Sequence, residues 1–204
     1  EVCSRPMRKV HLVSFETQPD GIRFALSQGN AFPLLSQYRI EIQSLLSQGS
    51  VQISNDSELS IEWTLLVGDF RTFIPTAPHA ELIYFDLYSP KVCLDLWSRR
   101  TFELCYQSLS SSNSGNSGKL ITYVSATAAR SALILAGFYV GQGTSTPVKR
   151  ETTLATLQRE ELSRPLGRDW FEHLRRSTKP FPMDCHHSDF HFLEIERKLQ
   201  LERV

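Results

Sequence analysis

Three acidic residues stand where predicted strands end, and each could bind or activate a ligand. They are Glu16 after the apolar run 9–16, Asp69 within 61–70, and Asp86 after 81–86. In open α/β sheets, ligands bind beyond the carboxyl ends of the strands, so we expect these carboxylates to cluster at one sheet edge. A single strand-end acid is more often a turn residue or a helix cap, but three on one edge indicate a ligand site.

The position of each acid indicates what it could contact. A carboxylate in the place of Glu16 suits the two hydroxyls of a ribose, as it does in dinucleotide-binding folds. A carboxylate in the place of Asp69 can meet an adenine edge. Asp86 is followed by Leu-Tyr-Ser-Pro at 87–90 and is expected where a reacting group would lie.

Six segments between residues 9 and 155 carry a family resemblance. They are KVHLVSFET (9–17), LLVGDF (65–70), AELIYFDLYSPKVCLDLW (80–97), GKLITYVSA (118–126), AGFYV (136–140) and VKRETTLA (148–155). The third segment has an aspartate–x–aromatic–small–proline pattern, from Asp86 to Pro90, that is followed by Trp97. In this order and spacing, the segments resemble the tRNA 5-methylaminomethyl-2-thiouridine methyltransferases.

The resemblance implies a role for several of these residues. Glu16 would hold the ribose of S-adenosylmethionine, and Asp69 and Phe70 would border its adenine. Asp86 would face the substrate amine as the catalytic residue. Tyr88, Ser89 and Pro90 would shape the substrate pocket, and Lys149 and Arg150 would contact tRNA phosphates. Predicted partners are tRNA and an oxidoreductase acting on the same nucleotide, because some relatives carry such a domain.

The implied reaction is S-adenosylmethionine-dependent N-methylation of the aminomethyl group of a modified wobble uridine in tRNA. Methyl transfer from a sulfonium is an in-line displacement, so alignment supplies most of the acceleration. By analogy with lysine, the acceptor amine is largely protonated near neutral pH. Asp86 can orient the ammonium and accept its proton. Tyr88 or Trp97 could stabilise the sulfonium by a cation–π contact, although the predicted helix favours a core position for Trp97.

Strands alternate with helical stretches from residue 9 to residue 157, which predicts an α/β fold with a mostly parallel sheet. The resemblance implies the Rossmann-like class I methyltransferase fold. We predict a methyltransferase domain over residues 1–157. Residues 158–204 are predicted to form a helical and extended tail that packs on this domain.

One part of the family pattern has no counterpart among these segments. The family begins its sheet with a strand and a glycine-rich loop that cradles the methionine part of the cofactor, and residues 1–8 supply neither. We therefore expect the first, central strand to be missing from this chain. The alternative function is a degenerate methyltransferase fold that binds RNA or a protein without catalysis. A nicotinamide-dependent oxidoreductase shares Glu16 but does not explain residues 86–90.

The expected absence of the glycine-rich cradle predicts weak binding of S-adenosylmethionine, or none, by the 204-residue chain. Titration calorimetry on this chain beside a version extended upstream measures the difference. Equal and tight binding by both would contradict the expectation.

Composition restricts the class of protein. Lys and Arg total 22 and Asp and Glu total 22, which excludes a strongly basic protein that binds nucleic acid by charge alone. The cysteines form no Cys-x-x-Cys pair and fit reduced thiols in the cytoplasm, the predicted location. No apolar run approaches the ~20 residues of a membrane span. The histidine-rich segment 185–191 is predicted to be a surface tail, and no metal site is predicted.

Overall fold

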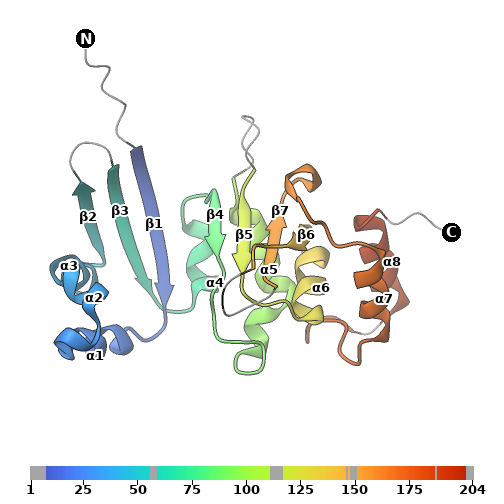
Figure 1. Ribbon diagram of the computed structural model, residues 1–204, viewed down its shortest axis with the longest axis horizontal. Helices are drawn as coiled ribbons and strands as arrows, with labels where there is room; N and C mark the ends of the chain where they lie inside the picture. Colours follow the sequence, from blue (N-terminus) through green and yellow to red (C-terminus); the bar gives the residue numbers. More distant parts are fainter. Residues whose placement is uncertain are drawn as a thin grey trace, which may run out of the picture. The chain divides into compact units, whose positions relative to one another are not determined.

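The computed structural model describes residues 8–55, 59–110, 117–145, 147, 151–186 and 188–200. The chain forms two compact units, Glu1–Ala77 and Pro78–Val204. Each unit contains its own sheet and helices (Figure 1). Each also has its own set of buried apolar residues.

The first unit is built on a three-stranded sheet in the order β1-β3-β2. Strands β1 (Arg8–Glu16) and β3 (Leu59–Val67) are parallel, whereas β2 (Ser50–Asn55) is antiparallel to β3. The Trp63 indole N–H donates to Ser14 Oγ across the parallel pair at 2.9 Å. Since parallel strands end at the same edge, β1 and β3 bring Glu16 opposite Val67 there.

Short helices follow strands β1 and β3 of this sheet along the chain. They are α1 (Asp20–Ser27), η1 (Gly29–Ala31), α2 (Pro33–Gln37), α3 (Arg39–Gln48), α4 (Phe70–Phe73) and η2 (Ile74–Thr76). Helix α3 ends at Gly49, whose φ of +79° lets the chain turn directly into β2. Leu26, Ile42, Leu45 and Leu65 are buried and form the apolar centre of the unit.

The second unit is built on a four-stranded sheet in the order β4-β5-β7-β6. Its strands are β4 (Leu82–Tyr84), β5 (Lys119–Thr122), β6 (Tyr139–Gln142) and β7 (Thr153–Thr156). Strand β5 is parallel to β4, and β7 is antiparallel to both β5 and β6, so only β7 is reversed. Each sheet thus has one reversed strand among those described, and the predicted α/β class is confirmed.

The helices of the second unit include those of its C-terminal part. They are η3 (Leu94–Trp97), α5 (Arg99–Ser108), α6 (Thr127–Leu135), η4 (Arg159–Glu161), α7 (Arg168–Arg176) and α8 (Asp189–Lys198). Helices α5 and α6 pack against each other, and α8 packs against α6 (Figure 1). The division into a domain over residues 1–157 and a tail over 158–204 stays a prediction.

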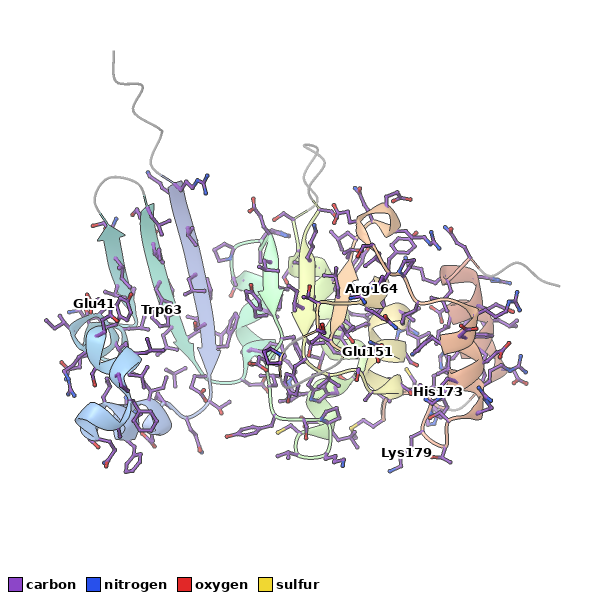
Figure 2. The ribbon with its side chains drawn as sticks, viewed as in Figure 1. Glu41, Trp63, Glu151, Arg164, His173 and Lys179 are labelled. Carbon is purple, nitrogen blue, oxygen red and sulfur yellow. The ribbon has the colours of Figure 1, made fainter. Side chains whose placement is uncertain are left out.

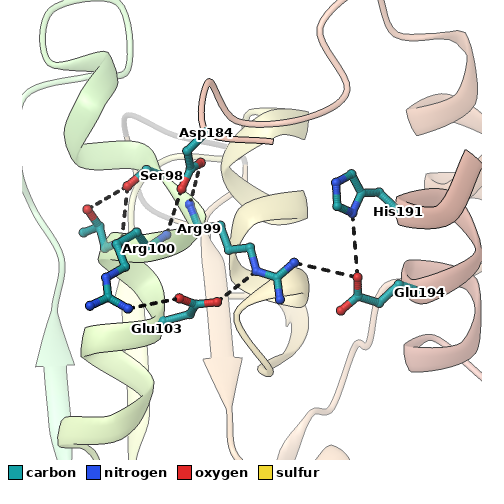
Figure 3. A network of polar contacts seen from close by, with 8 residues as sticks. Ser98, Arg99, Arg100, Glu103, Asp184, His191 and Glu194 are labelled. Atoms are coloured by element: carbon teal, nitrogen blue, oxygen red, sulfur yellow. Dashed lines mark hydrogen bonds and ion pairs between the residues drawn. The ribbon is translucent and has the colours of Figure 1, made fainter. Parts of the chain in front are cut away.

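A polar network joins the C-terminal part of this unit to helix α5 (Figure 3). The Asp184 carboxylate accepts hydrogen bonds from the backbone N–H groups of Arg99 and Arg100, both at 2.9 Å. The Arg99 guanidinium pairs with Glu103 at 2.9 Å and lies 3.9 Å from Glu194 of α8. The two hydrogen bonds to Asp184 satisfy backbone N–H groups at the start of α5 that have no partner within the helix.

Glu161 attaches η4 to the start of β5. Its side chain is only 12% exposed, accepts the Ser117 N–H at 2.8 Å and lies 3.5 Å from Lys119 Nζ. Burial alone raises the pKa of this carboxyl, but the Ser117 hydrogen bonds and the Lys119 charge hold it below its ordinary value of 4.5. A lowered pKa means that the ionised carboxylate stabilises the folded state above the unfolded pKa.

We expect Glu161→Gln to lower the free energy of unfolding at neutral pH by about 1 kcal/mol, because the amide lacks the charge that strengthens these hydrogen bonds. The difference from the wild type should shrink as pH falls below 4.5 and through the lowered pKa, where the wild-type carboxyl takes up a proton. Urea unfolding of both proteins across this pH range measures it. A difference that stays constant with pH would contradict the charged role.

Candidate functional site

Asp86 follows strand β4 in the second unit and is exposed. Phe85 extends the pairing of β4, because its N–H donates to the Ile121 carbonyl at 2.8 Å, and its ring is buried. Alternation along an extended chain then directs Asp86 to the opposite side. Within the described part of the chain, no hydrogen bond or ion pair engages the Asp86 carboxylate, so it can accept a proton or bind a cation.

The segment after Asp86 is held by two side chains from other elements. The Trp97 indole N–H donates to the Tyr88 carbonyl at 2.8 Å, and the Tyr123 hydroxyl donates to the Leu87 carbonyl at 2.8 Å. The Ser89 carbonyl accepts the N–H groups of residues 92 and 93, which makes a tight turn after Tyr88. The backbone beside Asp86 is therefore fixed.

Two aromatic residues of this segment have different environments. The side chain of Tyr88 is exposed, at 75%, and is available to a ligand. Trp97 is 2% exposed and packs edge-on against Phe85, with ring centroids 5.1 Å apart, and against Phe102. The structure therefore confirms the core position that the sequence favoured for Trp97. The predicted pocket role of Tyr88, Ser89 and Pro90 stays a prediction.

In the first unit, the register of β1 and β3 places Glu16 and the Gly68–Asp69 turn at one edge of the sheet. The Gly68 N–H donates to the Glu16 carbonyl at 2.9 Å. Glu16 as a residue is half-buried, and its Oε1 accepts the Gln18 N–H at 3.0 Å. The structure thus brings together the two acids expected to bind a nucleoside.

Asp69 is the N-cap of helix α4. Its Oδ1 accepts the Arg71 N–H at 3.0 Å, and the Arg71 guanidinium donates to both carboxylate oxygens. The hydrogen bonds from the Arg71 side chain hold the pKa of Asp69 below its ordinary value, against a smaller opposing effect of burial. Phe70 is buried against Phe15, with ring centroids 6.2 Å apart. Asp69 therefore has a structural role as a cap, and its contact with adenine stays a prediction.

Asp86 belongs to the second unit, whereas Glu16 and Asp69 belong to the first. That the three acids share one cleft stays a prediction, because it joins residues of both units. Lys149 and Arg150 lie outside the described residues, and their contact with tRNA also stays a prediction.

Arg130 is a buried charged residue that no sequence motif singled out. Its side chain is 3% exposed, and its Nη1 lies 2.9 Å from Glu151, which Figure 2 labels. Its Nε and Nη2 donate to Thr153 Oγ1 and the Thr152 carbonyl at 3.0 and 3.1 Å. The Thr153 hydroxyl donates to the Val124 carbonyl at 2.7 Å. Arg130 of α6 therefore holds the start of β7 and, through Thr153, the segment that follows β5. The sequence feature that could have indicated this buried role is a single arginine within a helix of small and apolar residues.

His191 and Cys185, from the histidine-rich segment 185–191, have environments that do not suit metal binding. The His191 ring packs against Phe181, with centroids 5.4 Å apart, and lies 3.7 Å from Glu194. Burial raises the pKa of the Cys185 thiol to about 11, so this thiol is protonated at neutral pH. Within the described residues, no group of His, Cys, Asp or Glu side chains could hold a metal ion. Nor is any helix of that part long and apolar enough to span a bilayer.

Comparison with known proteins places this geometry in context. Residues 34–158, more than half of the chain, match a family described as S-adenosyl-L-methionine-dependent methyltransferase. The chain is similar to the tRNA 5-methylaminomethyl-2-thiouridine biosynthesis bifunctional protein MnmC of Polaromonas naphthalenivorans, at 26% identity over 149 residues. That alignment covers 71% of this chain and 22% of the relative, so the chain spans about a fifth of its length.

A solved structure has a similar fold. The crystal structure of MNMC2 from Aquifex aeolicus matches with a TM-score of 0.56 at 17% identity, covering 94% of this chain and 68% of that one. The family match includes Asp69 and Asp86, whereas Glu16 precedes its first residue.

Proposed function

Because the chain belongs to the S-adenosyl-L-methionine-dependent methyltransferase family, we propose that it methylates the aminomethyl group of a modified wobble uridine in tRNA. The name of the Polaromonas relative, which describes tRNA 5-methylaminomethyl-2-thiouridine biosynthesis, supports this substrate. The observation that carries the proposal is the exposed Asp86 carboxylate on a backbone held by Trp97 and Tyr123.

Asp86 has the properties that the acceptor amine requires. A protonated alkylamine has no free lone pair and cannot act as a nucleophile, so it must first lose a proton. The Asp86 carboxylate can bind the ammonium as a counter-ion and then take its proton, directly or through a water molecule. The hydrogen bonds of Trp97 and Tyr123 hold the backbone that carries this side chain, which reduces the freedom that Asp86 must lose when it aligns with the amine.

The residues at the edge of the first unit fit the nucleoside part of S-adenosylmethionine. Glu16 offers a carboxylate at a strand end, and carboxylate oxygens accept hydrogen bonds from ribose hydroxyls. The buried Phe70 ring adds an apolar neighbour after Asp69. When bound, this cofactor supplies the electrophilic methyl group on its sulfonium. Tyr88 has an exposed ring that suits a cation or a base.

Two partners follow from the proposed reaction. The first is tRNA, whose modification locates the activity in the cytoplasm. The second is the oxidoreductase predicted from the sequence to act on the same nucleotide; the Polaromonas relative is named a bifunctional protein, which is compatible with a second activity beside methyl transfer.

The proposal is tested by incubating the version of the chain that is extended upstream with methyl-labelled S-adenosylmethionine and tRNA that carries the aminomethyluridine. We expect label on that nucleotide, identified by mass spectrometry after digestion, and none on the same tRNA without the aminomethyl group. Binding of RNA without any methyl transfer would instead support the non-catalytic module.

A further inference from the structure

Helices α1 and α3 of the first unit form the walls of an open groove of about 540 Å³. It is lined by Arg23, Leu26, Ser27, Arg39, Gln43, Leu46 and Ser47. Successive lining residues are three and one positions apart on α1, and four, three and one positions apart on α3. Such spacing places each set on one face of its helix. The groove is therefore formed by two facing helix stripes.

The charged groups of this groove are all positive. Arg23 and Arg39 face it from different helices, and no acidic residue lines it. Ser27 and Ser47 donate their hydroxyl hydrogens to backbone carbonyls of their own helices, so the side-chain donors left are the two guanidinium groups and the Gln43 amide. Two cations in one groove repel each other unless an anion lies between them.

The acidic residues nearest in sequence do not cancel this charge. Asp20 pairs with Arg23 at 2.9 Å, but its side chain is 84% exposed, so water weakens the interaction. Glu41, labelled in Figure 2, is two positions from Arg39, a spacing at which helical side chains do not face each other. Among the described residues, Arg39 has no carboxylate partner. Its guanidinium is available to a phosphate, which it can bind with two parallel hydrogen bonds.

An exposed aromatic residue is adjacent in sequence to each arginine, although neither aromatic is among the residues that line the groove. Phe24, next to Arg23, is 64% exposed, and Tyr38, next to Arg39, is 45% exposed. Aromatic rings on a positively charged surface are the usual means by which proteins bind single-stranded nucleotides, because bases stack on the rings while the backbone contacts the cations.

We propose that the groove between α1 and α3 binds the phosphate backbone of an unpaired RNA segment, with Phe24 and Tyr38 stacking on its bases. The inference rests on the proposed function, because a tRNA-modifying enzyme must hold unpaired nucleotides near the one that it modifies. It assigns the substrate-binding surface to helices that carry none of the residues predicted for catalysis.

The test measures binding of a fluorescent anticodon stem-loop RNA to the full chain over a range of salt concentrations. Arg23→Ala with Arg39→Ala should weaken binding at least about tenfold. The plot of log affinity against log salt should become shallower by about 0.7 for each phosphate that the variant no longer binds.

Phe24→Ala with Tyr38→Ala should weaken binding by about fivefold or more, because the bases have no ring to stack on, and should leave the salt slope unchanged. The matched control is Arg175→Ala with Arg176→Ala on α7, which removes the same charge and should bind as the wild type does.

Several results would overturn the proposal. They are no RNA binding by the wild type, wild-type affinity in the Arg23 and Arg39 variant, or an equal loss of affinity in the α7 control. A dimer that dissociates when Phe24 and Tyr38 are replaced, with unchanged RNA affinity, would assign the surface to a second copy of the chain. RNA binding that depends on the groove, without any methyl transfer by the version extended upstream, would contradict the proposed function alone. Normal transfer and an unchanged KM for tRNA in the arginine variant would contradict the groove alone.

Discussion

In the version of the chain that is extended upstream, Asp86→Asn is expected to reduce single-turnover methyl transfer to aminomethyluridine tRNA by about 10²–10⁴-fold, the usual loss when a positioned proton acceptor is removed. Asparagine has nearly the shape of aspartate but neither its charge nor its basicity. The exposed Asp86 side chain makes no hydrogen bond or ion pair among the described residues that the change would break. Cofactor affinity and melting temperature should therefore stay close to those of the wild type.

The matched control is Glu81→Gln, which removes a carboxylate charge from an exposed position just before the same strand, β4. It should transfer methyl groups at the wild-type rate. Rapid-quench transfer of labelled methyl and a thermal melt are measured on all three proteins. If Asp86→Asn transferred normally but was less stable by about 1 kcal/mol, as on removal of a helix or turn cap, Asp86 would be structural and the proposed mechanism would lack its base.

Arg130→Met is expected to lower the free energy of unfolding by about 2–4 kcal/mol. Methionine has a similar length, so the side-chain volume changes little, but the Thr153 hydroxyl oxygen loses its donor and the Thr152 carbonyl keeps only the hydrogen bond from the Gly143 N–H. Each buried polar group left without a partner costs about 1–3 kcal/mol. Urea unfolding followed by circular dichroism measures the change.

Glu151→Gln provides the comparison. The Glu151 side chain is 40% exposed, whereas the Arg130 side chain is 3% exposed, so water partly replaces the ion pair and the expected change is about 1 kcal/mol. A neutral or stabilising Arg130→Met change would show that desolvation of the guanidinium costs as much as its hydrogen bonds contribute. That outcome would contradict the assigned role of Arg130.

Much of the fold could be predicted from periodicity, but several elements could not, among them strand β2 and helix α8. The predicted runs 9–16 and 61–70 are strands β1 (Arg8–Glu16) and β3 (Leu59–Val67), with ends that differ by at most three residues. Strand β2 was not predicted, because Ser50–Asn55 contains only Val51 and Ile53 as apolar residues and is stable as a strand only when paired with β3. Helix α8 was not predicted either, because its Ile195 becomes a core residue only when the helix packs against α6.

For the candidate site, the sequence by itself determined which residues stand at strand ends, because an alternating strand places Phe85 in the core and Asp86 outside it. It could not determine the partners of those residues. The engagement of Asp69 by Arg71 depends on the geometry of a helix cap. The hydrogen bonds of Tyr123 with Leu87, and of Arg130 with Thr153, join residues 36 and 23 positions apart. The groove likewise exists only because α1 and α3 face each other. Local sequence sets the direction of a side chain, but only the folded chain brings distant donors and acceptors within hydrogen-bonding distance.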